Sequence, residues 1–260
     1  MGRTRFTMTV GLAIMFLRLS QVAAETPGDN ISLEVESKIQ SPGKQPGSIE
    51  VTYTLVNTSA KPITAYKFGC THALQSSNGN FAYVGEDGYL PWERFQAGEV
   101  DETQRKGYIL PRERISQTIS LNLNERDGPF SGTTCEVVVV IYADTSVEGE
   151  ASLAESFFQQ RATTATDAKN AYRVLLEQLA HGKSLNDAIG KIASEQRRDA
   201  LNENGANGAV DFISQLRETA RGDQEHIANM ALAQLRSDYQ RAMKHLPAEW
   251  ERIVLKRTEP

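Results

Sequence analysis

The sequence predicts an α+β protein in two parts, an N-terminal antiparallel β-sandwich followed by a C-terminal α-helical bundle or set of helical hairpins. Two observations lead to this prediction. Apolar residues recur at every second position up to about residue 143, and at every third or fourth position after residue 144. Turn-forming clusters of Gly, Pro, Asn and Asp also separate the short runs of the first half.

The first half contains four runs with clear strand character. Residues 31–36, 49–55 and 115–123 alternate apolar with polar side chains, as antiparallel strands with one buried face do. Residues 135–143 are apolar on both faces, which is typical of a central strand. Several short strands with turns between them predict a sandwich.

The second half contains four amphipathic stripes joined by short connections, which predicts a small bundle or two hairpins. Gly182 is expected to end the first helix, and Ser184 with Asp187 to cap the second. Asp223 is expected to cap the fourth helix, and Pro247 to close it. The stripes run from Leu153 to Leu179, from Leu185 to Ile192, from Ala209 to Ala220 and from Leu232 to Leu246.

The first 24 residues have the pattern of a bacterial signal peptide. Arg3 and Arg5 precede an apolar run at 10–17, and the small residues before Glu25 suit cleavage there. The apolar run is shorter than the roughly 20 residues that span a bilayer. We therefore expect export to the periplasm or beyond, and a mature chain with a sandwich domain at 25–148 and a helical domain at 149–260.

The distribution of charge excludes some partners. Residues 25–150 contain 10 Lys/Arg and 18 Asp/Glu, whereas residues 151–260 contain 15 of each. Nucleic acids and anionic lipids require a basic face. An acidic first half and a neutral second half therefore argue against both.

The only two cysteines, Cys70 and Cys135, lie on positions expected to face the core. Cys135 shares its two-residue phase with Val137, Val139 and Ile141. In an exported chain this favours a structural disulfide between two strands. The alternative is a pair of buried thiols that lie too far apart to bond.

The motifs of common catalytic and cofactor sites do not occur in the sequence. The four histidines are scattered, with no H-x-x-x-H or H-E-x-x-H spacing. A search for nucleophile elbows, phosphate loops and dinucleotide fingerprints also finds nothing. We therefore expect no cofactor, no metal site and no catalytic residues.

The least regular segment, residues 84–108, is the candidate for a binding loop. Tyr89, Trp92 and Phe95 lie within seven residues, and aromatic side chains on loops often anchor ligands. Alternatively, these three side chains fold back to cover the end of the sandwich or to dock the helices. The acidic residues of 85–102 leave open a role as hydrolase catalysts or as Ca²⁺ ligands.

The run IEVTYTLVNTSAKPITAYKF resembles the second and third strands of bacterial secreted immunoglobulin-like domains. The run VVVVIYADTSVEGE is similar to the last strands of uncharacterised exported proteins that continue into a helical tail. The resemblance implies an adhesive or scaffolding role and no catalytic residues. The positions of the cysteines depart from the usual antibody-type pair.

Together these patterns predict an exported, non-enzymatic binding or scaffold protein of the cell envelope. The acidic sandwich is expected to bind a protein or an envelope component, and the helical half to dock a partner or form a homo-oligomer. An envelope hydrolase and a carbohydrate-binding module are the alternative hypotheses.

Overall fold

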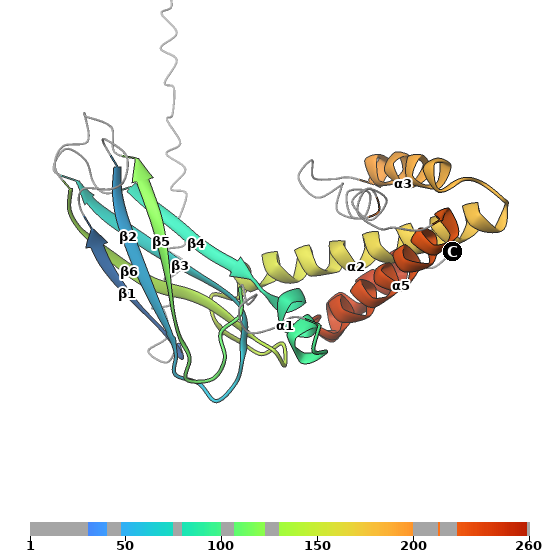
Figure 1. Ribbon diagram of the computed structural model, residues 1–260. Coiled ribbons are helices and arrows are strands. Elements are labelled where there is room, and N and C mark those ends of the chain that lie inside the picture. The colour runs from blue at the N-terminus through green and yellow to red at the C-terminus, as the bar shows by residue number, and fades with distance from the viewer. Residues whose placement is uncertain are drawn as a thin grey trace, which may run out of the picture.

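The computed structural model describes residues 31–40, 48–74, 80–99, 107–122, 130–199, 213 and 223–258. Antiparallel sheets occupy the N-terminal half and helices the C-terminal half, so the predicted α+β class is confirmed (Figure 1). The predicted signal peptide at 1–24 lies outside the described residues. So does the third predicted helix, apart from Ile213.

Two antiparallel sheets form the N-terminal half, with strand orders β1-β2-β5 and β4-β3-β6-β7. The chain passes from one sheet to the other after β2, after β4 and after β5. The strands are β1 (Leu33–Gln40), β2 (Ser48–Asn57), β3 (Ile63–Leu74), β4 (Asn80–Asp87), β5 (Arg114–Asn122), β6 (Phe130–Tyr142) and β7 (Val147–Gly149).

The two sheets enclose a common hydrophobic core. In β2, Val51, Tyr53 and Leu55 are buried, and the Tyr53 ring lies 5.2 Å from the Phe68 ring of β3, measured between centroids. The intervening Thr52 faces outward, where its hydroxyl lies 3.0 Å from that of a threonine on β5. The predicted alternation along this strand is therefore confirmed.

Strand β6 buries both faces because the second sheet lies between the first sheet and the helices. The register against β3 pairs Lys67 with Val139 and Phe68 with Val137, so one extra residue of β6 forms a bulge. The bulge reverses the side-chain phase. Val139 and Ile141 consequently face the helices. The prediction that these two side chains point into the sandwich core together with Cys135 is wrong.

The helices are α1 (Tyr89–Gln96), α2 (Ala151–Ala180), α3 (Leu185–Asp199), α5 (Gln224–Lys244) and α6 (Ala248–Thr258). Gly182 follows α2 with a φ of 69°. The Ser184 hydroxyl accepts from the Asp187 amide, and the Asp187 carboxylate accepts from the Ser184 amide, which forms the predicted capping box. Asp223 caps α5 by accepting from the amide of His226 at 2.8 Å.

Helices α2 and α5 run side by side, away from the sheets (Figure 1). α3 packs on the far half of α2, and α6 also contacts α2. Two hydrophobic clusters hold this half together, one against the second sheet and one between α2, α3 and α5. No helix in the described part of the chain combines the length and apolar character needed to span a membrane.

Candidate functional site

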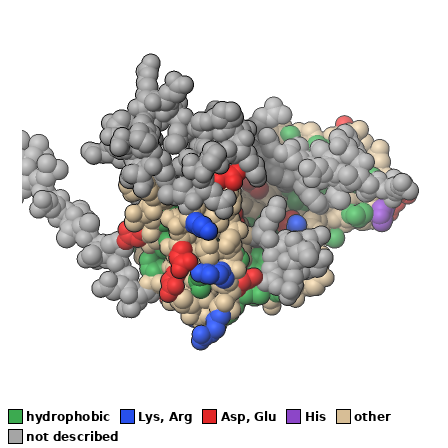
Figure 2. Space-filling model, turned by 60° about the vertical axis from the view of Figure 1, so that its left-hand side comes forward, with side chains coloured by type: hydrophobic (Ala, Val, Ile, Leu, Met, Phe, Trp, Pro, Cys, Tyr) green, Lys and Arg blue, Asp and Glu red, His purple; other side chains and the backbone are tan. Residues whose placement is uncertain are grey.

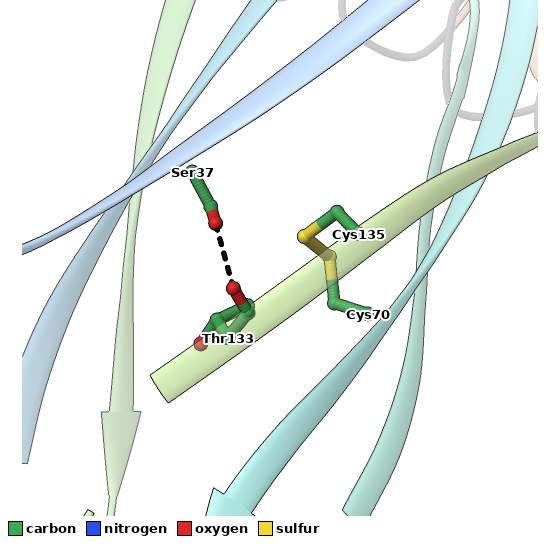
Figure 3. Close-up of a disulfide and its surroundings, with 4 residues drawn as sticks. All are labelled: Ser37, Cys70, Thr133 and Cys135. Atoms are coloured by element: carbon green, nitrogen blue, oxygen red, sulfur yellow. Dashed lines mark hydrogen bonds between the residues drawn. A yellow bond between two sulfur atoms is a disulfide. The ribbon is translucent and has the colours of Figure 1, made fainter. Parts of the chain in front are cut away.

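The two cysteines form a disulfide between neighbouring strands of one sheet (Figure 3). Cys70 on β3 and Cys135 on β6 lie directly opposite each other in the register, with Cα atoms 4.2 Å apart. Ser37 of β1 donates a hydrogen bond of 3.1 Å to the carbonyl of Thr133, close to the disulfide. The disulfide therefore fastens β3 to β6 where the first sheet covers them.

The segment expected to be an irregular binding loop contains helix α1. Pro91 is the third residue of this helix, a position where the missing N–H breaks no intrahelical hydrogen bond. The expectation of an irregular segment is thus wrong for residues 89–96. The helix lies where the sheets meet α2 and α5 (Figure 1).

Helix α1 sends its three aromatic side chains to two different places. Tyr89 is buried, with its ring 4.9 Å from the Arg161 guanidinium and 5.7 Å from the His245 ring. Trp92 and Phe95 instead pack with Tyr108, at centroid distances of 5.5 and 5.7 Å from it. The three predicted residues therefore do not form a single aromatic platform.

A buried ion pair joins the sheets to the helices. The guanidinium of Arg161 on α2 donates to the carboxylate of Asp87, from Nη2 at 2.8 Å and from Nε at 3.0 Å. Arg161 is 0% exposed and the Asp87 side chain 9% exposed. Arg161 also donates to the carbonyl of His245 at 3.2 Å, so one side chain ties α2 to β4 and to the end of α5.

Arg161 was not among the site residues predicted from the sequence. It lies on the buried stripe of α2, three residues after Phe158 and four before Ala165. A lone arginine in such an apolar stripe must pair with a carboxylate or leave the core. This conflict identifies Arg161 as a residue of the junction, the region where the sheets meet α2 and the end of α5.

Glu93 of α1 forms a second link to the end of α5. Its carboxylate accepts from Lys244 Nζ at 2.9 Å and lies 3.0 Å from Nε2 of the buried His245. Burial acts to raise the pKa of Glu93, but the hydrogen bonds from Lys244 and His245 outweigh it and lower the pKa. Burial lowers the pKa of His245, against the opposing effect of Glu93. The arrangement suits a neutral imidazole that donates to an ionised carboxylate.

The remaining carboxylates of this segment also have partners. Glu99 pairs with Arg241 of α5, and Glu86 accepts from the amide of Gln117 at 2.9 Å. Asp87, Glu93 and Glu99 thus anchor this segment to the helical half, whereas Glu86 links β4 to β5. Asp101 and Glu102 lie outside the described residues.

The described residues contain no group of three or more His, Cys, Asp or Glu side chains arranged to hold a metal ion. The acidic residues that suggested Ca²⁺ binding do not gather around one point in this part of the chain. Asp87 is turned to Arg161, and Glu93 to Lys244 and His245. These contacts favour ion pairing over cation coordination.

Two hollows follow one another between α2 and α5, and together we name them the α2/α5 groove. The hollow nearer the sheets has a volume of about 210 Å³, and the farther one about 450 Å³. The near hollow is lined by Lys169, Tyr172, Leu235, Arg236, Tyr239 and Gln240. The far hollow is lined by Leu176, Leu179, Ala180, Lys183, Leu185, Gln224, Glu225, Ala228, Asn229 and Leu232.

The α2/α5 groove exposes apolar surface of a kind that a folded chain normally buries. Leu176, in the far hollow, is 48% exposed, the highest value among the large apolar side chains of the described residues. No site was predicted on these helices from the sequence, although an apolar strip that could contact a partner was expected there. The groove is therefore the second candidate site.

The sheet end of the molecule presents a different surface. In Figure 2, basic and acidic side chains lie beside one another on the described part of this face. Arg114 of β5 and Glu36 of β1 form an exposed ion pair of 2.8 Å.

Comparisons with known proteins leave the family open. No protein-family model and no curated protein matches the chain. One similar solved structure is a Northeast Structural Genomics Consortium target, with 16% identity over 45% of this chain and 78% of its own length, and a TM-score of 0.27. Another is a hypothetical protein from Peptoclostridium difficile 630. It is 15% identical over 51% of this chain and 92% of its own length, with a TM-score of 0.31.

Proposed function

We propose that this chain is an exported, non-enzymatic binding or scaffold protein of the cell envelope, whose helical half docks a protein partner. One observation carries the proposal: an apolar groove lies open between two long helices that are anchored to the sheets by a buried ion pair. Anchored helices hold a binding surface in place, which lowers the conformational entropy that binding costs.

The strand order supports an immunoglobulin-like sandwich at 25–148 as the scaffold. In the orders β1-β2-β5 and β4-β3-β6-β7 the chain crosses between the sheets three times, and crossings of this kind also occur in Greek-key sandwiches. Strand β7 ends at Gly149 and α2 begins at Ala151, in line with a helical domain from residue 149. The Cys70–Cys135 pair supports export, because disulfides persist in oxidising compartments.

The contacts of the acidic segment argue against the hydrolase alternative. Asp87 and Glu93 are each engaged by basic side chains of the helical half. The carbohydrate-binding alternative loses support because Tyr89 is buried in the junction, away from Trp92 and Phe95. The groove is the better candidate for the site of binding.

Site-specific photo-crosslinking in the producing cells tests the proposal. A photoreactive residue at Leu176, in the groove, should give a discrete cross-linked product in the envelope fraction. The matched control carries the same residue at Met230, which is 39% exposed on α5 and does not line the groove. Identical products from both positions, or none from Leu176, would contradict the proposal.

Export is tested separately with a reporter enzyme that is active only outside the cytoplasm. A fusion to the full chain should be active, and a fusion that lacks residues 1–24 should be inactive. Equal activity of the two fusions would remove the envelope from the proposal but leave the binding role untouched.

A further inference from the structure

We propose that the α2/α5 groove binds an acidic amphipathic helix supplied by a different protein. This inference rests on the proposed binding function and names the partner's chemistry. An amphipathic helix laid in an apolar groove is a common mode of protein recognition, with apolar anchors at i, i+3, i+4 and i+7.

The first argument is that the groove continues a stripe of α2 that is buried nearer the sheets. Ala154, Phe158, Ala162 and Ala165 lie on this stripe and pack in the cluster that includes Val254 of α6. At the same spacing of three and four residues the stripe continues as Lys169, Tyr172, Leu176 and Leu179. Residues three and four apart share one helix face, so the second half of the stripe extends the surface that α6 helps to cover.

The second argument is the shape of the groove. The two hollows adjoin, because Tyr172 of the near one and Leu176 of the far one are one helical turn apart. At a rise of 1.5 Å per residue the α2 side of the groove extends about 15 Å from Lys169 to Leu179, and Lys183 follows the end of the helix. That length suits a helix of at least about ten residues.

The third argument is charge. The lining residues include the cations Lys169, Lys183 and Arg236, and a single carboxylate, Glu225. Within the described part of the chain, no carboxylate lies within ion-pair distance of Lys169 or Arg236, and the Lys169 ammonium lies 5.3 Å from the centre of the Tyr239 ring. In a chain of net charge −5, this excess of cations around an apolar floor favours an acidic ligand.

The test uses the mature chain, residues 25–260, and designed peptides of about 16 residues. The probe has leucines at helical i, i+4 and i+7 spacing and glutamates on its flanks. One control peptide has the same composition without the leucine stripe, and another has lysine in place of every glutamate. Binding is measured by fluorescence anisotropy at low and at high salt.

The acidic probe should bind more tightly than both control peptides, and its affinity should fall as salt screens the cations. Leu176→Asp should raise the Kd of the acidic probe about tenfold, because the leucines of the peptide would lose their apolar contact with Leu176. The paired change Lys169→Glu with Arg236→Glu should also raise it about tenfold and favour the lysine peptide instead. Met230→Asp, outside the groove, is the matched control and should leave the Kd unchanged.

Three results would overturn the inference: no binding of the acidic probe, equal binding of the three peptides, or an equal effect of Met230→Asp and Leu176→Asp. A fourth is a dimer in light scattering that Leu176→Asp dissociates, since a second copy would then occupy the groove. If Leu176 gives a cross-linked product but the acidic peptide does not bind, the acidic helix is the wrong partner. The proposed docking function would then remain supported.

Discussion

Arg161 and Asp87 are 74 residues apart in the chain, yet the guanidinium and the carboxylate meet at 2.8 Å in the interior, between α2 and the end of β4. The pair is buried on both sides and shares the junction with Tyr89 and His245. The orientation of the helical half toward the sheets therefore depends on an interaction that neither half contains alone.

Replacing Arg161 with methionine should lower the free energy of unfolding by about 3–5 kcal/mol, because Asp87 would remain as an unpaired charge in the interior. The double change Arg161→Met with Asp87→Leu should recover much of that loss. Urea unfolding followed by circular dichroism measures both. As a control, Arg114→Ala breaks an exposed ion pair and should cost less than about 1 kcal/mol. A loss that small for Arg161→Met would contradict the structural role of the pair.

His245 should make the stability depend on pH in mildly acidic solution. Its pKa in the folded protein is lowered from the ordinary value of 6.5, mainly because the imidazole is buried. The unfolded chain therefore binds the proton more readily, and the free energy of unfolding should fall as the pH drops from about 6.5 through the lowered pKa. Urea unfolding at a series of pH values measures this slope.

His245→Gln should flatten the pH dependence of the unfolding free energy between pH 6.5 and the lowered pKa. Glu93 acts in a lower interval. Its lowered pKa contributes stability above the ordinary value of 4.5, and that contribution is lost as the pH falls through the folded value. An unchanged slope in His245→Gln would show that another group titrates there.

Removing the disulfide should lower the free energy of unfolding by about 4 kcal/mol. Cys70 and Cys135 are 65 residues apart, and the cross-link restricts the unfolded chain by closing that loop. The double Cys→Ala variant should unfold at correspondingly lower urea. Two free thiols per chain in the non-reduced protein, counted by mass spectrometry after alkylation, would contradict the pairing.

Gly149 should tolerate no side chain. Its φ is 91°, and a Cβ there would lie 2.2 Å from the carbonyl oxygen of Val138, at the bulge of β6. Gly149→Ala should therefore cost about 2 kcal/mol in urea unfolding, through strain and displacement of the start of α2. Gly190→Ala is the matched control, because open space surrounds that position on α3, and it should be neutral or stabilising by about 1 kcal/mol. Equal effects of the two changes would contradict this view of the junction.

Several features of the fold were predictable from local patterns. The two-residue alternation of β2, the capping box of Ser184 and Asp187 and the stop at Gly182 all follow from neighbouring residues. Cys135 is the only other cysteine, so the sequence favoured its bond to Cys70 but left open that the two thiols lie too far apart. Helix α1 was missed because its proline and flanking glycine resemble loop chemistry.

The junction and the groove required the tertiary structure. Nothing local to Arg161 shows that Asp87 will face it, because their approach depends on the path of the intervening strands and helices. Similarly, the sequence shows the apolar stripe of α2 but not that α6 ends before the stripe does.

The sequence by itself therefore determined the kind of each main element and the α+β class, because periodicity and turn chemistry act over a few residues. Tertiary structure decided which buried charges pair and which apolar surface stays open, because both depend on contacts between distant segments. In this protein those contacts leave Leu176 exposed in the groove and hold Arg161 in the interior.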